Sequence, residues 1–416
     1  MAARTVVITG VGAVTPSGPT APDLWRSVLR GRSGVTLLPG ELTAGLPVRV
    51  GGLVGRYPAA ADLPVSVARR LSPVQQWAIA AADEALADAG VDRAAGPLPW
   101  EPPRLCIIVA TGSGPVSTVL QAASGFRDRG PRQVSPALVV FGTADAAAGI
   151  LSQRYGARGS TQAVVAACAS GAIGIGEGMR RIRHGYADAV LVVGMDDCMN
   201  PVHLAANANL RTLATGCADD PASASRPFDR ARSGFVMAQG AGAVLLESRD
   251  SALRRGARPQ AVVAGFGDTS DAHHPTSPHP DGHGAAAAIR ACLSDADTSA
   301  YRVDHVNTHG TGTLLGDRAE IAALTHALGE RAHSIPLTAT KSSTGHLLGA
   351  SGVVEAIVAV MTLRDQLLPP TINLTDSEFD GWDFVRDLPR AHATETVLSN
   401  SFGFGGHNAA LLLTAV

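Results

Sequence analysis

One cysteine stands where a short apolar run meets a helix-length segment that carries few side chains. Residues 163–167 have the composition of a buried strand, whereas residues 169–183 have the length of a helix and contain glycine at positions 171, 174, 176 and 178. Each of these glycines would cost a helix about 1 kcal/mol relative to alanine. Close packing therefore explains the segment better than helix propensity. We expect a helix enclosed by its neighbours, with Cys168 at the base of a cavity.

The two ends of this helix carry ordinary signals. Three arginines within residues 180–183 suit a helix C-terminus, Gly185 is a suitable cap, and residues 187–194 form another apolar strand. Cys168 then lies at the start of the helix, a position that favours a thiolate. A small buried cysteine without a function fits the local sequence about as well. Both interpretations stay open on this segment alone.

Composition limits the classes of protein that need to be considered. The 416 residues are 45% hydrophobic, which is enough for a large core in two to three domain-sized units. The net charge of -2 and the lack of a basic tail argue against a nucleic-acid partner. The five cysteines show no zinc-type spacing, so we expect reduced thiols in the cytoplasm. No apolar run approaches the ~18 residues of a membrane span, and the first residues resemble a strand and turn instead of a signal peptide.

Apolar runs alternate with helix-like segments, which indicates an α/β protein with helices covering its sheets. A first strand at 5–11 is followed by a loop at 12–18, and Ser72 and Gly90 cap a helix at 72–89. Further strands are expected at 105–110, 241–246, 259–265, 304–307, 335–339, 396–399 and 409–414, and further helices at 144–154, 201–211, 284–295, 317–327 and 352–365.

The sequence of residues 262–267 echoes that of residues 7–12, because each is an apolar run ending in Gly-x-Gly. The echo suggests two similar halves that meet near residue 255. We therefore predict an N-terminal domain at 1–255, which carries Cys168, and a C-terminal domain at 256–416.

Two histidines of the second half stand in glycine loops that follow predicted strands. His309 lies in Thr-His-Gly-Thr-Gly-Thr at 308–313, and His346 lies in Ser-Thr-Gly-His-Leu-Leu-Gly at 343–349. Glycine lets the backbone approach a ligand closely, so both loops are candidate functional sites. Lys341 is the only lysine among 34 basic residues. Unless it survives by chance in an arginine-rich composition, it fills a role that the wider guanidinium group does not suit.

A cysteine and two histidines admit more than one thiol chemistry. A protease-like Cys/His pair is one interpretation, but two hydrogen-bond-donating histidines suit a carbonyl whose neighbouring carbon becomes an anion. The glycine-rich loop at 400–408 offers unobstructed backbone N–H groups for an oxyanion hole. A histidine-rich stretch at 273–283 lacks a regular ligand pattern, so we interpret it as a solvated loop and expect no metal site.

Six segments of the chain carry a family resemblance. They are ACASGA around Cys168, RPFDRARSGFV at 226–236, HPDG at 279–282, NTHGTGT at 307–313, TKSSTGHLLGASG at 340–352 and NSFGFGG at 400–406. Together they resemble the β-ketoacyl-acyl-carrier-protein synthases, which include elongating enzymes of fatty-acid synthesis and ketosynthases of type II polyketide systems. The resemblance implies a thiolase-like fold of five α-β-α-β-α layers, built from two similar halves and working as a dimer.

The resemblance also implies roles at the matching positions. Cys168 would receive the primer acyl group from an acyl carrier protein as a thioester. His309 and His346 would bind the malonyl thioester carbonyl and stabilise the enolate that forms as carbon dioxide leaves. The N–H groups of Cys168 and Phe404 would hold the oxyanion when this enolate attacks the acyl group, and Phe404 would also gate the cysteine.

Other matching positions concern orientation and binding. Lys341 would supply positive charge beside the histidines with Glu355 as its partner, and Thr311 and Thr313 would contact the pantetheine arm. The carrier protein brings that phosphopantetheine arm, so no cofactor of the chain's own is implied. The expected function is a decarboxylative Claisen condensation with malonyl-acyl-carrier protein, in type II polyketide or other secondary-metabolite synthesis more than in fatty-acid synthesis.

Several positions depart from the family pattern. His407 stands where elongating synthases usually have threonine, and Ser233 and Gln239 replace acidic residues. Pro115 and Asn207 fall at positions that line the acyl pocket with larger apolar side chains. None of these changes removes a catalytic group. They point towards an unusual, polar or unsaturated acyl chain.

Alternative functions within the same fold remain. A chain-length-factor-like partner subunit shapes the pocket of a true synthase but lacks the active cysteine, whereas this chain retains Cys168. The chain fits equally the active half of such a heterodimer or a homodimer. A third alternative transfers acyl groups without decarboxylation. The two histidine motifs point away from a thiolase, which would use a second cysteine, and from an initiating synthase, which would carry Cys, His and Asn. The carrier protein is expected to be acidic, and Arg69 and Arg70 are candidates for docking it.

Overall fold

The computed structural model describes residues 4–55, 57, 65–94 and 96–416. Within these residues ten strands form a sheet of two five-stranded halves, which are joined where β1 pairs with β8 through Val7–Val262 and Ile8–Ala261. From the centre outward, the first half contains β1 (Val6–Val14), β7 (Gly240–Ser248), β6 (Ala189–Asp196), β4 (Leu105–Ala110) and β5 (Thr161–Val164). The second half contains β8 (Ala261–Ser270), β14 (His407–Thr414), β13 (Thr396–Gly403), β9 (His305–Asn307) and β10 (Leu337–Thr338).

The two halves repeat one topology. In each half the two inner strand pairs are antiparallel and the two outer pairs are parallel. The strand order β1-β7-β6-β4-β5 thus matches the order β8-β14-β13-β9-β10 in both position and direction. This repeat confirms the expected thiolase-like fold of two similar halves. The boundary at residue 255 stays a prediction; it falls between α10 (Arg249–Arg254) and β8.

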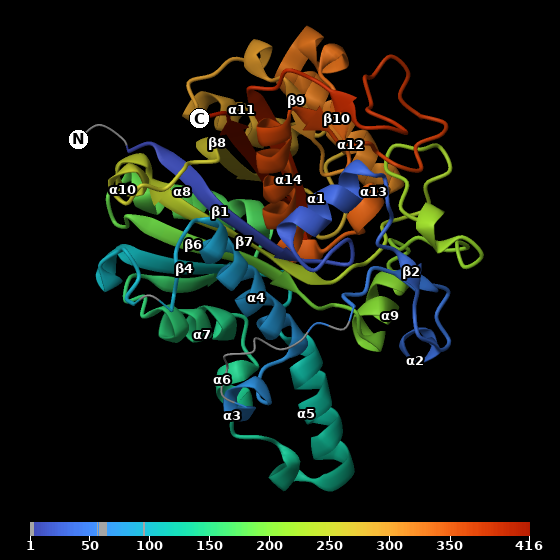
Figure 1. The fold of residues 1–416 in the computed structure, drawn as a ribbon. Helices are drawn as coiled ribbons and strands as arrows, with labels where there is room; N and C mark the ends of the chain where they lie inside the picture. Colours follow the sequence, from blue (N-terminus) through green and yellow to red (C-terminus); the bar gives the residue numbers. More distant parts are fainter. Residues whose placement is uncertain (1–3, 56, 58–64, 95) are drawn as a thin grey trace.

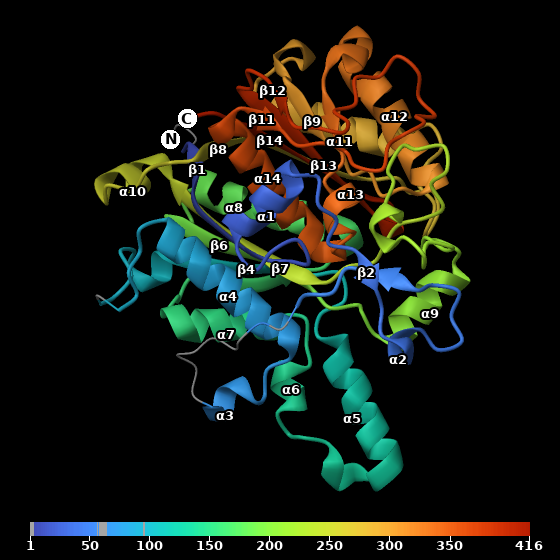
Figure 2. The same cartoon turned by 45° about the vertical axis from the view of Figure 1, so that its right-hand side comes forward.

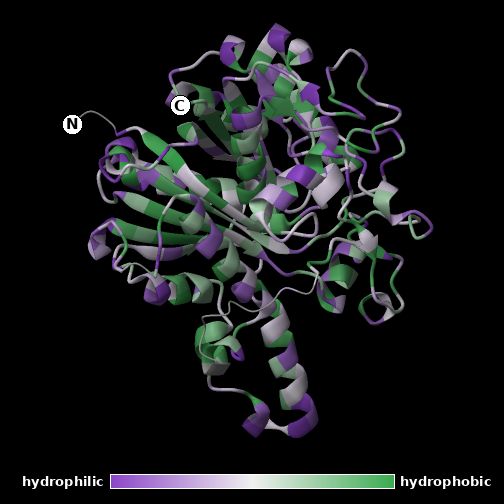
Figure 3. Cartoon of the chain, viewed as in Figure 1, coloured by the Kyte–Doolittle hydropathy of each residue, from purple (hydrophilic) through white to green (hydrophobic). Residues whose placement is uncertain are grey.

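Helices cover both faces of each half and produce five layers (Figures 1 and 2). The outer layers are α4 (Pro73–Asp88) with α7 (Ala146–Tyr155) on one side and α11 (His283–Asp295) with α12 (Leu314–Leu328) on the other. Between the half-sheets lie α8 (Ser170–Arg183) and α14 (Ser351–Asp365). The structure has three apolar cores: one surrounds the two central helices and reaches both half-sheets, and one lies beneath each outer layer of helices. Most of the sheet is coloured as hydrophobic in Figure 3.

The glycine-rich helix α8 is enclosed as the sequence predicts. A Cβ atom on Gly171 would lie 2.7 Å from the backbone nitrogen of Val353 in α14, and one on Gly352 would lie 2.5 Å from that of Ala172 in α8. The two central helices therefore cross at backbone contact. A Cβ on Gly176 would lie 2.3 Å from the ring of Phe266 in β8. Close packing thus replaces helix propensity as the reason for these glycines.

The first strand is longer than its sequence suggested. The expected loop at 12–18 is wrong for residues 12–14, because β1 continues to Val14. Gly10 and Gly12 do not end the strand. Cβ atoms there would lie 2.0 and 2.1 Å from carbonyl oxygens of α4, so the glycines let that helix pack directly on the strand. Gly265 and Gly267 of β8 play the same part against α11, where the corresponding distances are 2.3 and 2.1 Å.

The buried strand expected at 163–167 is wrong in both extent and burial, because β5 ends at Val164 and is only partly buried at the edge of the sheet. The strand expected at 335–339 is limited to β10. Two other boundaries agree with the sequence analysis. Ser72 caps α4 with a reciprocal capping box, as expected for a helix starting Ser-Pro. The strand at 105–110 is confirmed residue for residue.

Figures 1 and 2 show α5 (Val116–Arg129) and α6 (Leu138–Phe141) extending away from the layered body, and no residue of α5 is buried. The remaining elements are α1 (Ala21–Leu29), α2 (Gly40–Thr43), α3 (Val65–Ala68), α9 (Pro201–Asn209), α13 (Lys341–Thr344), β2 (Thr36–Leu37), β3 (Val50–Gly51), β11 (Leu367–Leu368) and β12 (Arg390–Ala391).

Candidate active site

Cys168 lies in a single 3-10 turn, η3 (Ala167–Ala169), between β5 and the start of α8. The turn is tight: Ala167 has φ +48°, in the left-handed region that side chains other than glycine rarely adopt. The hydroxyl of Ser170 accepts the N–H of Ala166 at 2.8 Å and fixes the approach of the chain. Gly403 at the end of β13 lies against this turn, since a Cβ there would be 2.9 Å from the Cys168 nitrogen. The nucleophile therefore meets the glycine-rich loop at its own backbone.

The thiol of Cys168 is held in its protonated form. Burial raises its pKa to about 12, and the ammonium of Lys341 and the N–H of Phe404 oppose this rise only in part. The expectation that the helix start favours a thiolate is therefore wrong for the unloaded site. Removal of water outweighs the nearby positive charge. Acylation must consequently remove the proton as the sulfur reacts.

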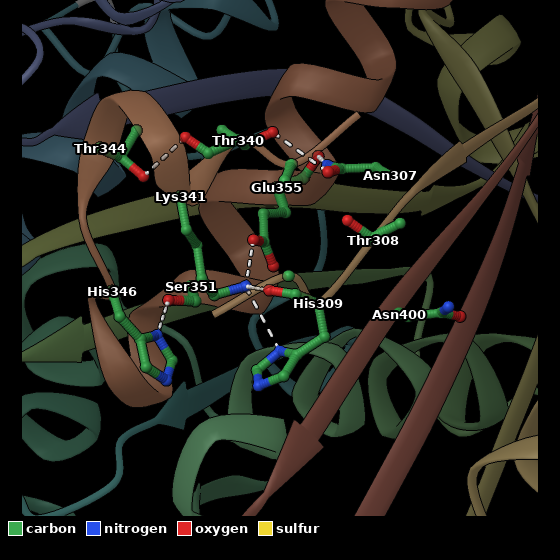
Figure 4. Close-up of polar contacts among 12 residues, drawn as sticks. Asn307, Thr308, His309, Thr340, Lys341, Thr344, His346, Ser351, Glu355 and Asn400 are labelled. Carbon is green, nitrogen blue, oxygen red and sulfur yellow. Dashed lines mark hydrogen bonds and ion pairs between the residues drawn. The ribbon is translucent and has the colours of Figure 1, made fainter. Parts of the chain in front are cut away.

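Lys341 is buried behind the cavity and joins two of the predicted loops (Figure 4). Its ammonium forms an ion pair with Glu355 of α14 and donates to the carbonyl oxygen of His309 at 2.6 Å. The same nitrogen lies 3.3 Å from Nδ1 of His309. An ammonium group can only donate, so Nδ1 of His309 accepts and the neutral ring carries its proton on Nε2.

His346 reaches the same tautomer by another route. Its Nδ1 accepts the backbone N–H of Leu348 at 3.3 Å and lies 3.0 Å from the hydroxyl of Ser351. The proton of the neutral ring is therefore on Nε2 as well. The rings of His309 and His346 meet edge to face, with centroids 5.4 Å apart and planes at 85°. Both histidines are neutral, because burial and the Lys341 charge hold their pKa values well below 6.5.

Three buried carboxylates that the sequence analysis did not single out as site residues hold these loops. Glu320 of α12 accepts the N–H groups of His309 and Gly310 at 2.7 and 2.8 Å. Asp317, one turn earlier, accepts the N–H of Gly312 at 3.1 Å. Asp196 at the end of β6 accepts three backbone N–H groups, those of Gly112, Ser113 and Gly349. The sequence signals that could have indicated them are an acidic residue at the end of an apolar strand and an acidic pair spaced by three in a helix.

A cavity of about 450 Å³ brings most of the predicted residues together. Its lining includes Cys168, His309, His346, Phe404, Thr311, Thr313 and Asn207. Thr311 and Thr313 are adjacent, with hydroxyl oxygens 3.0 Å apart. Lys341 and Glu355 lie behind this lining. Pro115 lies at the start of α5 and is not part of the lining, so its place in an acyl pocket stays a prediction.

Ring contacts join the histidine-rich loop to α11 and α12 beside the cavity, whose lining includes His279. His273, His279, His283 and His326 form successive ring contacts with centroids 4.8, 5.3 and 5.2 Å apart. Among residues with described positions, no group of three or more histidine, cysteine, aspartate or glutamate side chains is arranged to hold a metal ion. In the same part of the chain, no helix is long and apolar enough to cross a membrane.

Comparisons with known proteins agree with this geometry. Residues 3–252 match the family model "Beta-ketoacyl synthase, N-terminal domain", and residues 260–375 match "Beta-ketoacyl synthase, C-terminal domain". The chain is 38% identical over 410 residues to 3-oxoacyl-[acyl-carrier-protein] synthase 2 of Synechocystis sp., covering 98% of this chain and 97% of that protein. It is also 38% identical to the enzyme of the same name from Vibrio cholerae, covering 99% of each chain.

Solved structures give the same result. A β-ketoacyl synthase from Burkholderia phymatum superposes with a TM-score of 0.90 at 31% identity, covering 99% of this chain and 100% of the other. A type II polyketide ketosynthase, described in complex with its acyl-carrier protein and bound to the hexaketide, has a TM-score of 0.91 at 28% identity with full coverage of both chains. The fold and site define a thiolase-like ketosynthase. The chain belongs to the β-ketoacyl synthase family and is an acyltransferase that forms carbon–carbon bonds.

Proposed function

We propose that the chain catalyses a decarboxylative Claisen condensation between an acyl group on Cys168 and a malonyl group on an acyl carrier protein. The observation that carries the proposal is the pair of neutral histidines in the cavity of Cys168, each with its proton on Nε2. Two such N–H donors suit one carbonyl oxygen that gains negative charge. Neither needs to lose a proton for this purpose.

The first half-reaction loads the enzyme. The sulfur of Cys168 attacks the acyl thioester of the carrier protein, a new carbon–sulfur bond forms, and the carrier thiol leaves with the proton that the cysteine gives up. The N–H groups of Cys168 and Phe404 bind the oxygen of the tetrahedral intermediate. This role of Phe404 is supported by the effect of its backbone N–H on the Cys168 thiol, whose pKa it lowers.

The second half-reaction makes the carbon–carbon bond. His309 and His346 donate to the malonyl thioester oxygen, the carboxylate leaves as carbon dioxide, and the electron pair of the broken bond forms an enolate. The enolate carbon attacks the acyl carbonyl on Cys168. The sulfur then leaves and is protonated, and the product is a β-ketoacyl thioester on the carrier. Lys341 keeps His309 in the tautomer that this step requires.

The carrier protein supplies the phosphopantetheine arm in this proposal, and the enzyme needs no cofactor of its own. Thr311 and Thr313 at the cavity wall are suited to bind the amides of that arm. The relatives from Synechocystis and Vibrio are named for acyl-carrier-protein substrates. Five unpaired cysteines suit a reducing compartment, so we place the enzyme in the cytoplasm.

We assign the reaction to type II polyketide or related secondary metabolism. Support comes from Asn207 in the cavity wall and from the high similarity to a polyketide ketosynthase. The curated relatives are named 3-oxoacyl-[acyl-carrier-protein] synthase 2, so fatty-acid elongation is the alternative assignment. The acyl chains that Cys168 accepts distinguish the two.

The enzyme is proposed to work as a dimer with a second copy or a related subunit. β5 is an edge strand, and Val165 just beyond it is exposed. The α5–α6 extension exposes Phe126, Val139 and Val140. Exposed apolar side chains on an extension and a free strand edge are each features that suit a subunit interface. Light scattering of the purified chain tests this part: a dimer of one chain supports the homodimer, and a monomer that dimerises only with a ketosynthase-like partner supports the heterodimer.

Release of carbon dioxide from malonyl-acyl-carrier protein tests the condensation itself. The proposal predicts release that depends on His309 and His346, and a longer β-ketoacyl product when a primer is present. A chain-length-factor-like subunit would release none, although it would still bind a ketosynthase. An acyltransferase without condensation would pass the primer on unchanged.

A further inference from the structure

One face of α9 contributes polar side chains to the cavity that contains Cys168. His203 and Asn207 are one helical turn apart, at positions i and i+4, and Leu210 follows at i+7; all three line the cavity. Ser113, in the loop after β4, lines the same cavity. The mechanism proposed above gives none of these polar groups a part in the chemistry.

The ring of His203 is held in a defined orientation and tautomer. Asn200 caps α9 by accepting the N–H of His203 through Oδ1 at 3.0 Å. The amide nitrogen of Asn200 lies 3.1 Å from Nδ1 of His203. The amide oxygen of Asn200 lies slightly farther from Nδ1, at 3.3 Å, and already accepts the backbone N–H of His203. The shorter contact is the one in which Nδ1 accepts, so we assign the proton of the neutral ring to Nε2. Burial lowers the pKa of His203, with Asp197 opposing the effect, which favours the neutral ring.

Asn207 is fixed in a similar way. Its amide nitrogen donates to the carbonyl oxygen of His203 at 3.0 Å. Within the described part of the chain, its Oδ1 atom and the Nε2 atom of His203 have no hydrogen-bond partner. Ser113 Oγ accepts the thiol of Cys198 at 3.5 Å and keeps its own proton for another acceptor. The cavity wall thus combines free donors with a free acceptor.

A saturated alkyl chain would cover these groups without replacing the water that they bind, and this carries a free-energy cost. An oxo group can accept from His203 Nε2 and Ser113 Oγ, and a hydroxyl group can also donate to Asn207 Oδ1. We propose that His203 and Asn207 select acyl chains bearing oxo or hydroxyl groups over saturated chains of equal length. This inference rests on the proposed function, because it concerns the acyl group carried by Cys168.

Paired pantetheine thioesters test the selection. Octanoyl-pantetheine and its β-oxo and β-hydroxy derivatives are offered separately, and the rate at which Cys168 gains each acyl mass is followed by intact-protein mass spectrometry. For the wild type we expect the oxygenated chains to react about tenfold faster than octanoyl, as for a site that hydrogen-bonds a substrate oxygen. His203→Leu and Asn207→Leu should each lower this ratio, slowing the oxygenated chains and accelerating octanoyl.

A matched control lies on the same helix. Val202 is 57% exposed and outside the cavity lining, so Val202→Ala should keep the wild-type ratio. Equal or faster wild-type acylation with octanoyl overturns the inference, and so does an unchanged ratio in both leucine variants. Carbon dioxide release from malonyl-pantetheine by the wild type distinguishes failure of this inference from failure of the proposed condensation. Release without selection removes only this inference, whereas absence of release removes the proposed condensation.

Discussion

Lys341 Nζ lies 3.3 Å from Nδ1 of His309 and is bonded to the carbonyl oxygen of the same histidine. The ammonium therefore fixes both the ring tautomer and the loop that carries the ring. Lys341 itself is outside the cavity lining. It acts through His309 and is a positioning residue. This relationship explains why the only lysine of the chain stands here, because a compact ammonium fits where a planar guanidinium does not.

Lys341→Arg tests that explanation with the charge retained. The site is 1% exposed, so the larger group should displace His309 or Glu355. We expect carbon dioxide release from malonyl-acyl-carrier protein to fall roughly a hundredfold, the loss typical of removing one oriented donor to a developing oxyanion. Acylation of Cys168, measured by mass, should persist and shows that the variant is folded. Wild-type release would mean that the lysine is incidental.

The histidines predict a specific pH dependence. Their pKa values lie well below 6.5, so the neutral, donating forms persist throughout the neutral range. Protonation can occur only as the pH falls below the ordinary value, and it would place a second cation beside Lys341. Decarboxylation should therefore stay level from about pH 8 down to about pH 6.5 and decline at lower pH. A decline that begins above this value contradicts the assigned protonation states.

The raised pKa of the Cys168 thiol predicts how the rate of its alkylation depends on pH. With a pKa of about 12, the thiolate fraction rises roughly tenfold for each pH unit over the accessible range. Alkylation by iodoacetamide, followed on the Cys168 peptide, should keep rising up to about pH 10 without a plateau. Cys217, which is more exposed, serves as the internal reference and should react faster. A plateau of the alkylation rate near neutral pH would show that Cys168 is a thiolate there, as the sequence analysis expected.

The central helices predict a contrast between two glycines. Gly171→Ala would place a methyl group 2.7 Å from the backbone of α14, and we expect a loss of about 3 kcal/mol in the free energy of unfolding. Gly149 lies inside α7 with no atom within 4 Å of a Cβ there. Gly149→Ala should therefore stabilise by about 1 kcal/mol. Denaturant unfolding of both variants decides the matter, and equal effects would show that packing is not the reason for the α8 glycines.

The sequence indicated functional or closely packed positions most clearly where a residue type is unusual for its context and has a specific physical role. The two histidine loops, the single lysine and the glycines of α8 indicated positions that the structure brings to one cavity or to one helix crossing. The Gly-x-Gly echo also reflects a real repeat, because both copies let a helix pack on a central strand. Reading Gly12 as the start of a loop failed because a glycine in a strand and a glycine in a turn look alike without the helix beside them.

Other parts of the site depend on contacts between distant segments. Asp196 and Glu320 hold loops that come from other strands, and a single sequence does not show which backbone N–H groups a carboxylate will meet. The protonated state of Cys168 has the same origin, since it follows from how completely neighbouring elements remove water. The polar face of α9 becomes visible only when His203 and Asn207 are seen to line the cavity of Cys168.

The most direct test of the central claim is mass analysis of both protein components in one reaction. The enzyme is first acylated, and malonyl-acyl-carrier protein is then added. We expect the acyl mass to leave the Cys168 peptide and a β-ketoacyl group two carbons longer than the acyl group to appear on the carrier. One carbon dioxide should be released per product. Cys168→Ala should form neither acyl-enzyme nor product, whereas Cys198→Ala should form both. Transfer of the unchanged acyl group to the carrier, without release of carbon dioxide, would contradict the proposed condensation.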